Sequence, residues 1–90
     1  MQDDNYCYLH RKYLGLLVQA TDSHHCLGGN KRKLSEQDGL KVNLCRECHR
    51  KLHDNLWHFR DLQQEAEQRW LDYNNASIED FIKRYGKNFI

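Results

Sequence analysis

The pattern of apolar and polar residues predicts two short strands followed by a helix in the middle of the chain. Residues 40–44, Leu-Lys-Val-Asn-Leu, alternate as a strand with one buried face does. Residues 21–29 form an earlier strand-like segment that ends in a Gly-Gly break. Between them, residues 30–39 are polar and end in Asp-Gly, which predicts a loop. Residues 45–53 then follow the second strand, and we expect them to be helical.

The most apolar run lies nearer the start of the chain. Residues 13–20 read Tyr-Leu-Gly-Leu-Leu-Val-Gln-Ala, with Gly15 interrupting the run. This mixture of propensities predicts a short helix or turn leading into a strand. We expect these side chains to belong to the core.

A helical pattern begins near Leu56 and continues to the end of the chain. Its apolar residues recur mostly at three- and four-residue steps, at Trp57, Phe59, Leu62, Ala66, Trp70 and Tyr73. This spacing predicts a helix with one apolar stripe, ending at Asn74-Asn75.

A last short helix is predicted after that break. Ser77 and Asp80 have the spacing of a capping box, and Gly86 suits the C-terminal cap. The buried side of this helix would be formed by Phe81, Ile82 and Tyr85. Residues 88–90 should pack back onto the domain.

The totals describe a single small domain, residues 1–90, with no overall charge signature. Fourteen Lys and Arg residues stand against thirteen Asp and Glu, so any basic surface must be local. Nothing approaches the roughly 20 apolar residues of a membrane span, so no membrane association is expected. The first residues lack the features of a signal peptide, which favours a reducing, cytoplasmic location. There, four cysteines are better explained as ligands or buried thiols than as disulfides.

Two cysteine-containing pairs have the spacing of half zinc sites. Cys7 and His10 form C-x-x-H, and Cys45 and Cys48 form C-x-x-C. Together they could fill all four positions of a tetrahedral zinc ion, which would make the site structural. The alternative is that Cys7 and His10 are incidental and the later cysteines are buried thiols.

Four histidines form a second candidate group, none of them needed for the zinc. They are His24, His25, His49 and His53, the last two on one face of the predicted helix. Three imidazoles with open positions suit a divalent ion that stabilises a leaving oxygen, while a free imidazole takes a proton from water. This set favours phosphodiester hydrolysis. Each histidine taken singly could instead be a solvated or chance residue.

These motifs resemble the HNH nucleases of the ββα-metal (His-Me finger) class, especially small HNH proteins encoded by phages. The resemblance covers about residues 6–60, through C-x-x-H, His-His-x-x-Gly-Gly, a polar loop, and Gly-Leu-Lys-Val-x-Leu-Cys-x-x-Cys-His. It extends more loosely to Tyr-Gly-Lys-Asn-Phe near the C-terminus. It implies an α+β fold, with a ββα-metal core at about residues 6–58 and a helical extension at about 59–90.

The resemblance also implies residue roles. His24, His49 and His53 would hold a catalytic divalent cation such as Mg²⁺, Mn²⁺, Ni²⁺ or Zn²⁺, and His25 would be the general base. Many members carry a structural zinc on two C-x-x-C pairs, which matches Cys7, Cys45 and Cys48 here. His10 stands where a fourth cysteine is usual.

The chain departs from the family at the middle asparagine of the motif, which holds the loop and orients the base. Asp38 is the better-placed substitute, and Asn43, the nearest asparagine, lies inside the second predicted strand. An ionised Asp accepts hydrogen bonds but cannot donate them. Because Asp38 can accept a hydrogen bond from the base, the resemblance implies a catalytic, base-orienting role for Asp38.

Six cations lie near the candidate site in sequence: Lys31, Arg32, Lys33, Lys41, Arg50 and Lys51. Beside a phosphate-cleaving centre they would neutralise the DNA backbone, with weak sequence preference because no base-reading element is evident. Without a metal site they would be an ordinary solvated surface.

The sequence thus predicts a metal-dependent endonuclease acting on DNA, working alone, as a homodimer or within a larger phage machine in the bacterial host cytoplasm. The alternative is a non-catalytic, zinc-stapled module that binds DNA or protein, with a decayed nuclease cleft. A redox role for Cys45 and Cys48 is disfavoured because no thioredoxin-like βαβ pattern surrounds them.

Overall fold

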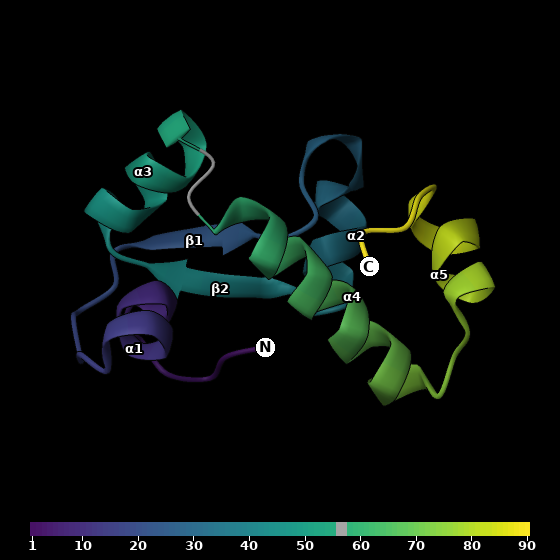
Figure 1. The fold of residues 1–90 in the computed structure, drawn as a ribbon, viewed down its shortest axis with the longest axis horizontal. Coiled ribbons are helices and arrows are strands. Elements are labelled where there is room, and N and C mark those ends of the chain that lie inside the picture. The colour runs from purple at the N-terminus through teal and green to yellow at the C-terminus, as the bar shows by residue number, and fades with distance from the viewer. Residues whose placement is uncertain (56–57) are drawn as a thin grey trace.

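The computed structural model describes residues 1–55 and 58–90 and has an α+β architecture (Figure 1). Within these residues a two-stranded antiparallel sheet is surrounded by five α-helices and one 3₁₀ turn. The elements in order are α1 (Tyr8–Leu14), β1 (Asp22–His25), the 3₁₀ turn η1 (Gly29–Lys31), α2 (Arg32–Gln37), β2 (Lys41–Leu44), α3 (Arg46–Asn55), α4 (Phe59–Asn74) and α5 (Ile78–Tyr85).

The sheet pairs the two strands that the sequence predicts. His24 of β1 lies opposite Val42 of β2, and His25 lies opposite Lys41. Val42 and Leu44 are buried, as is Leu40 just before the strand. A one-residue slip in this pairing would turn every side chain to the other face, so the buried positions of β2 hold His24 on the inward side of β1.

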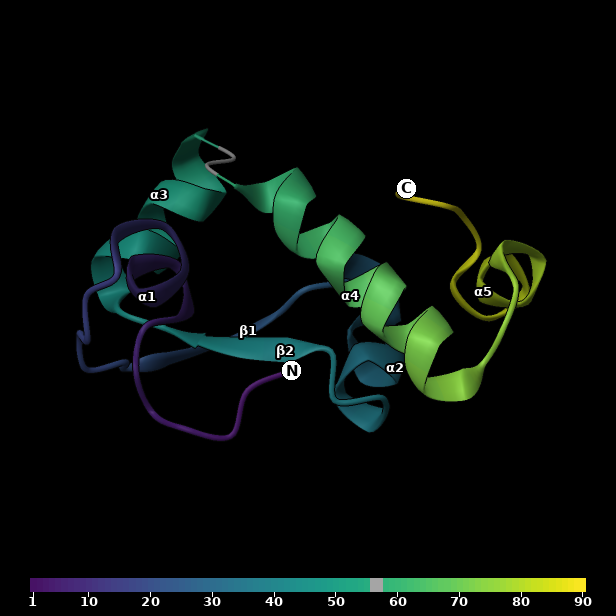
Figure 2. The same cartoon turned by 60° about the horizontal axis from the view of Figure 1, so that its bottom comes forward.

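The helices divide between the two ends of the sheet (Figures 1 and 2). α1 and α3 lie near one end, α2 lies near the other, and α4 runs from α3 towards α5. One cluster of buried residues joins these elements, from Cys7 and Leu9 through Leu52 and Leu62 to Phe81. The predicted C-terminal extension therefore shares its core with the sheet.

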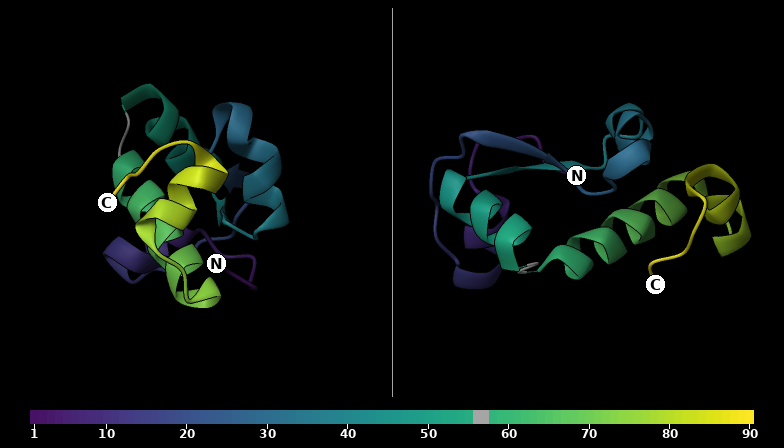
Figure 3. Two further views of the ribbon diagram at one scale, coloured as in Figure 1. Left: turned by 90° about the vertical axis from the view of Figure 1, so that its right-hand side faces the viewer. Right: turned by 90° about the horizontal axis from the view of Figure 1, so that it is seen from above.

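The C-terminal helix and tail follow the sequence prediction closely. The Ser77 hydroxyl accepts a hydrogen bond from the Asp80 backbone N–H, and the Asp80 side chain accepts one from the Ser77 N–H. Gly86 ends α5 in the left-handed conformation. The tail then runs back beside α4 (Figure 3), where the Phe89 N–H donates to Glu67.

The structure corrects several sequence-based expectations about local structure. Residues 30–39, predicted to be a loop, contain most of η1 and all of α2. The apolar run at residues 13–20 contributes little to the core: Leu14, Leu16 and Leu17 are exposed, Leu17 by 67%. α1 starts earlier than predicted, at Tyr8, and ends at Gly15, whose φ of 67° suits glycine.

The apolar stripe of α4 is confirmed only in part. Leu62 and Ala66 are buried, but Tyr73 is 91% exposed. The last turns of α4 face α5 rather than the sheet, with Trp70 packed edge-on against Phe81. The buried side of the helix therefore shifts to include Leu71.

The buried side of α5 agrees with the prediction at two of its three positions. Phe81 and Tyr85 of α5 are buried as expected, whereas Ile82 is 40% exposed. Leu56, where the helical pattern begins, and Trp57, the first residue of the stripe, lie outside the described residues. Among the helices of residues 1–55 and 58–90, none combines the length and the apolar character needed to cross a membrane.

Candidate metal centres

The first candidate centre joins the start of α1 to the start of α3. Cys7 precedes α1 and His10 lies in its first turn, while Cys45 precedes α3 and Cys48 lies in its first turn. Their four ligand atoms all lie within 4.8 Å of one another. His10 Nδ1 is 3.3 Å from the Cys7 sulfur, 3.6 Å from the Cys45 sulfur and 3.3 Å from the Cys48 sulfur.

These distances fit a tetrahedral zinc ion. Ordinary Zn–S and Zn–N bond lengths at a tetrahedral angle put sulfur and nitrogen about 3.5 Å apart. All three sulfurs face the same ring nitrogen of His10, so one ion can contact all four atoms. The Cys3His group can therefore hold a metal such as zinc.

The thiols of this group also favour a cation. Burial and the neighbouring Cys45 and Cys7 sulfurs raise the pKa of Cys48, because thiolates repel one another. Burial also acts to raise the pKa of Cys7, but hydrogen bonds from the Cys45 and His10 backbone outweigh it and lower that pKa to about 7. A cation would relieve the repulsion. Four protein ligands would leave no open position on a bound ion, which is the arrangement of structural zinc sites.

The second candidate centre lies between β1 and α3. Ligand atoms of His24, His49 and His53 also lie within 4.8 Å of one another. His49 and His53 are one helical turn apart, and their Nε2 atoms are separated by 3.1 Å. Two imidazole nitrogens bound to one tetrahedral ion lie about 3.3 Å apart, so this pair suits a shared ion. His24 completes the group from the strand, with its ring centre 5.5 Å from that of His49 and 5.6 Å from that of His53.

Asp22 fixes the orientation of His49. Its Oδ2 lies 3.0 Å from His49 Nδ1. The pKa of Asp22 is lowered, chiefly by its hydrogen bond with His49 and then by that with Thr21, so the ionised carboxylate accepts a hydrogen bond from the Nδ1–H of His49. The lone pair of His49 is then on Nε2, the atom that faces His53. A carboxylate behind a histidine is the usual support of a metal-binding imidazole.

His24 is the buried member of the group. Burial, followed by repulsion from His49, His53 and His25, lowers its pKa to about 4. A neutral imidazole is the form that binds a metal ion. His24 therefore has a nitrogen lone pair available near neutral pH.

His25 lies next to this group and has a different environment. The Arg32 Nε–H donates to His25 Nδ1 at 3.2 Å. Arginine can only donate, so Nδ1 carries the lone pair and the proton of the neutral ring lies on Nε2. Nε2 is 3.5 Å from Oε1 of Glu36. Arg32 and Glu36 both come from α2, the element that the sequence pattern predicts to be a loop.

The side chain of Asp38 does not have the predicted base-orienting position. Arg84 donates to both carboxylate oxygens of Asp38 at 2.7 Å, and the Tyr85 hydroxyl donates to one of them. Asp38 thus attaches the end of α2 to α5, and the carboxylate beside His25 is that of Glu36. The other sequence candidate, Asn43, donates to the backbone oxygen of Asp4.

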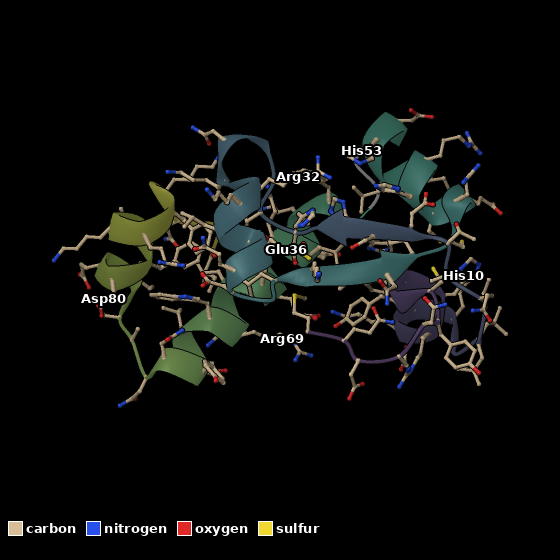
Figure 4. The ribbon with its side chains drawn as sticks, turned by 180° about the vertical axis from the view of Figure 1, so that it is seen from behind. His10, Arg32, Glu36, His53, Arg69 and Asp80 are labelled. Carbon is tan, nitrogen blue, oxygen red and sulfur yellow. The ribbon has the colours of Figure 1, made fainter. Side chains whose placement is uncertain are left out.

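A cleft of about 400 Å³ opens over the four histidines. We call it the histidine cleft; its lining consists of Ser23, His24, His25, Gly28, Gly29, Arg32, His49, His53 and Phe59. Figure 4 shows Arg32 and Glu36 on α2 and His53 on α3, with His10 lying apart from them towards α1. The structure thus separates a closed cysteine-containing centre from an open histidine-containing one.

The six predicted DNA-contacting cations are distributed unevenly around this cleft. Arg32 lines it, and Lys33 is exposed on the same helix. Lys31 points instead towards Gly86, with its terminal carbon and nitrogen near that residue. The other three are paired on the surface, Lys41 with Glu36, Arg50 with Asp54 and Lys51 with Glu47.

Two residues of the site are not predicted by the sequence motifs. Asp22 precedes His24 by two positions, and alternate strand residues share a face, so the strand prediction contained this signal. Glu36 carried no such signal, because its contact with His25 depends on α2 being a helix packed beside β1.

Comparison with known proteins identifies no relative of this chain. It matches no protein-family model, no curated protein and no solved structure. A functional assignment therefore rests on the side-chain arrangement in the two centres.

Proposed function

We propose that this chain is a metal-dependent endonuclease of the ββα-metal (HNH) class that hydrolyses DNA phosphodiester bonds. The observation that carries the proposal is the convergence of His24, His49 and His53 beside His25 in one open cleft. The ββα-metal assignment is supported by the order of β1, β2 and α3 in the chain and by the antiparallel pairing of the strands.

His24, His49 and His53 would hold the divalent ion. An ion at such a site acts as a Lewis acid on a phosphate oxygen and stabilises the negative charge that develops there. The residues support this through the neutral state of His24 and the Asp22 contact that directs His49 Nε2 towards His53. The exposed position of His53 leaves the ion accessible to a substrate.

His25 would act as the general base. Its Nδ1 lone pair is the acceptor that Arg32 now contacts, so a water molecule must take the place of that Arg32 hydrogen bond. Arg32 would then turn to the phosphate, where a guanidinium binds two oxygens well. Glu36 is a positioning residue in this scheme, because its carboxylate faces Nε2 and would stabilise the imidazolium after proton transfer.

The substrate assignment to DNA rests on charge and access. Arg32 lines the cleft and Lys33 is exposed on α2, so both can approach a phosphate backbone. Lys41, Arg50 and Lys51 have acidic neighbours, but such exposed pairs are weak enough to exchange for phosphate. Whether the chain acts singly, as a homodimer or within phage machinery stays a prediction.

Cleavage of supercoiled plasmid tests the proposal. Wild type with Mg²⁺, Mn²⁺ or Ni²⁺ should nick the plasmid, and His25→Ala should lower the rate by about 10²–10⁴-fold, the usual contribution of a general base. His58→Ala is a matched control, because His58 lies at the start of α4 and contacts Asp61. Equal nicking by wild type and His25→Ala would refute the mechanism.

A specific observation also supports the second candidate, a non-catalytic zinc-stapled binding module. Arg32 donates a hydrogen bond to the lone pair of His25 Nδ1. Asp38 accepts hydrogen bonds from Arg84 and Tyr85 instead of contacting His25. If Arg32 stays in place with DNA bound, His25 cannot take a proton. Plasmid that is retained in gel-shift assays but never nicked, with any of the three ions, would favour the module.

A further inference from the structure

A second cleft adjoins the histidine cleft and shares part of its lining. This tail cleft, of about 590 Å³, lies between η1, the start of α4 and the C-terminal tail. Gly28, Gly29 and Phe59 line both clefts. Neither glycine has a side chain, so at these two positions only backbone lies between the adjoining hollows.

The charged residues in the two linings differ from those in another large hollow of the structure. Among the described residues that line the histidine and tail clefts, none has a carboxylate side chain, while Arg32, Lys31 and Lys87 are present. Another large hollow contains Asp38 and Asp72. In a chain with a net charge of only +1, two adjoining linings without carboxylate side chains favour an anionic ligand.

The far wall of the tail cleft is aromatic and well fixed. Phe89 is held by its N–H bond to buried Glu67 and by the Gln64 amide, which donates to its carbonyl oxygen at 3.0 Å. Its ring packs edge-on against Phe81 and is half-buried, so part of it stays exposed. The Lys87 ammonium lies 5.2 Å from the centre of this ring.

From this arrangement we infer that the tail cleft binds the single-stranded stretch of DNA that flanks the phosphate held in the histidine cleft. Proteins commonly bind unpaired nucleotides with cations beside an aromatic ring, since phosphates contact the cations and bases stack on the rings. Gly28 and Gly29 would let the strand pass from one cleft to the other. The inference rests on the proposed function for the choice of DNA, but it concerns strand binding and not cleavage.

Two variants test it with the fold preserved. Lys87→Gln removes one cation of the tail cleft, and Gly28→Val places a branched side chain between the clefts. A Cβ on Gly28 would meet only the His25 backbone oxygen, at an ordinary 3.9 Å, and Gly28 has a φ of −89°, which other residues adopt. Lys83→Gln is the matched control, because Lys83 is an exposed cation of α5 that is not among the lining residues.

The measurement is fluorescence anisotropy with a labelled eight-nucleotide single strand and a labelled dinucleotide, all proteins carrying His25→Ala to prevent turnover. We expect Lys87→Gln and Gly28→Val to weaken binding of the eight-nucleotide strand at least five-fold. Lys87→Gln should change dinucleotide binding less than two-fold, and the Lys83→Gln control should change binding of either probe less than two-fold. Eight-nucleotide affinities within two-fold of the parent in both variants, with unchanged melting temperatures, would overturn the inference. Tighter, Lys87-dependent binding of the same sequence as a duplex would also overturn it.

The outcomes for cleavage and for strand binding are separable. Lys87-dependent binding together with an absence of plasmid nicking by the wild-type protein would support the tail cleft and refute the nuclease proposal. His25-dependent nicking, together with strand binding that is unchanged in Lys87→Gln and Gly28→Val, would support the nuclease proposal and refute strand binding in the tail cleft.

Discussion

Asp22 and His49 are joined across the β1–α3 interface by a contact of 3.0 Å between Oδ2 and Nδ1. The contact uses the ring nitrogen that does not face His53, since the Nε2 atoms of His49 and His53 approach each other to 3.1 Å. β1 thus supplies His24, a candidate ligand, and Asp22, which contacts the candidate ligand His49. The strand and the helix together define the site.

Asp22→Asn should weaken binding of the second metal ion. An amide can still contact His49, but it no longer stabilises the Nδ1 proton as a carboxylate does, and losses of about 10–100-fold in affinity are typical for such supports. Titration of Mn²⁺ by electron paramagnetic resonance measures this affinity. Asp54→Asn, an exposed α3 residue paired with Arg50, is the control and should bind as wild type. Equal affinities for the two variants would show that Asp22 does not support the site.

The cysteine centre should control stability and the histidine centre should not. Cys48→Ser removes a buried thiol of the proposed zinc site, and we expect it to cost about 3 kcal/mol or more, or at least about 12 °C in melting temperature. His49→Ala should change stability by only about 0.5 kcal/mol, in keeping with a partly exposed site away from the core. Thermal melts with zinc analysis test both. Cys26→Ala separates ligand loss from core damage, because it should keep its zinc. The reverse order of stabilities would contradict the division into two centres.

Glu36 and Asp38 are only two residues apart, but Glu36 should affect the nicking rate and Asp38 should affect stability. Glu36→Gln removes the charge facing His25 Nε2 and should lower the nicking rate while the melting temperature holds. Asp38→Asn breaks the bidentate contact with Arg84 and should cost about 1–3 kcal/mol in the free energy of unfolding. Urea melts and single-turnover nicking report the two effects. A selective loss of nicking in Asp38→Asn would restore Asp38 to the base-orienting role.

The capping box of α5 offers a test of the C-terminal architecture. Ser77→Ala deletes the acceptor for the Asp80 N–H and should cost about 1 kcal/mol. Ser77→Thr keeps a hydroxyl and should lie close to wild type. Chemical denaturation of the two variants measures the difference, and indistinguishable midpoints would mean that α5 does not unfold with the domain.

The features that could be predicted from the sequence are those with short-range signals. C-x-x-H, C-x-x-C and the i,i+4 histidines concern residues within one turn, and the structure brings both ligand groups together. Strand alternation located Val42 and Leu44, and the Ser77–Asp80 spacing located α5. These signals describe the chain before it packs.

The features that could not be predicted depend on packing between distant elements. α2 has six residues and only Ser35 fully buried, so it presents no apolar period to detect. Without knowledge of α2, the sequence cannot place Glu36 beside His25, so the base-orienting role is assigned to Asp38 instead. Leu16 and Leu17 are expected in the core but are exposed in the structure. An apolar run does not have to enter the core when the chain turns at Gly15.

Counting bound metals tests the central claim most directly. Native mass spectrometry of the wild-type protein in Mn²⁺ should show one tightly held zinc and one exchangeable ion per chain. A His49→Ala, His53→Ala double variant should keep the zinc and lose the exchangeable ion, with its melting temperature nearly unchanged. A single metal in the wild type, or loss of the zinc in the double variant, would contradict two separate centres.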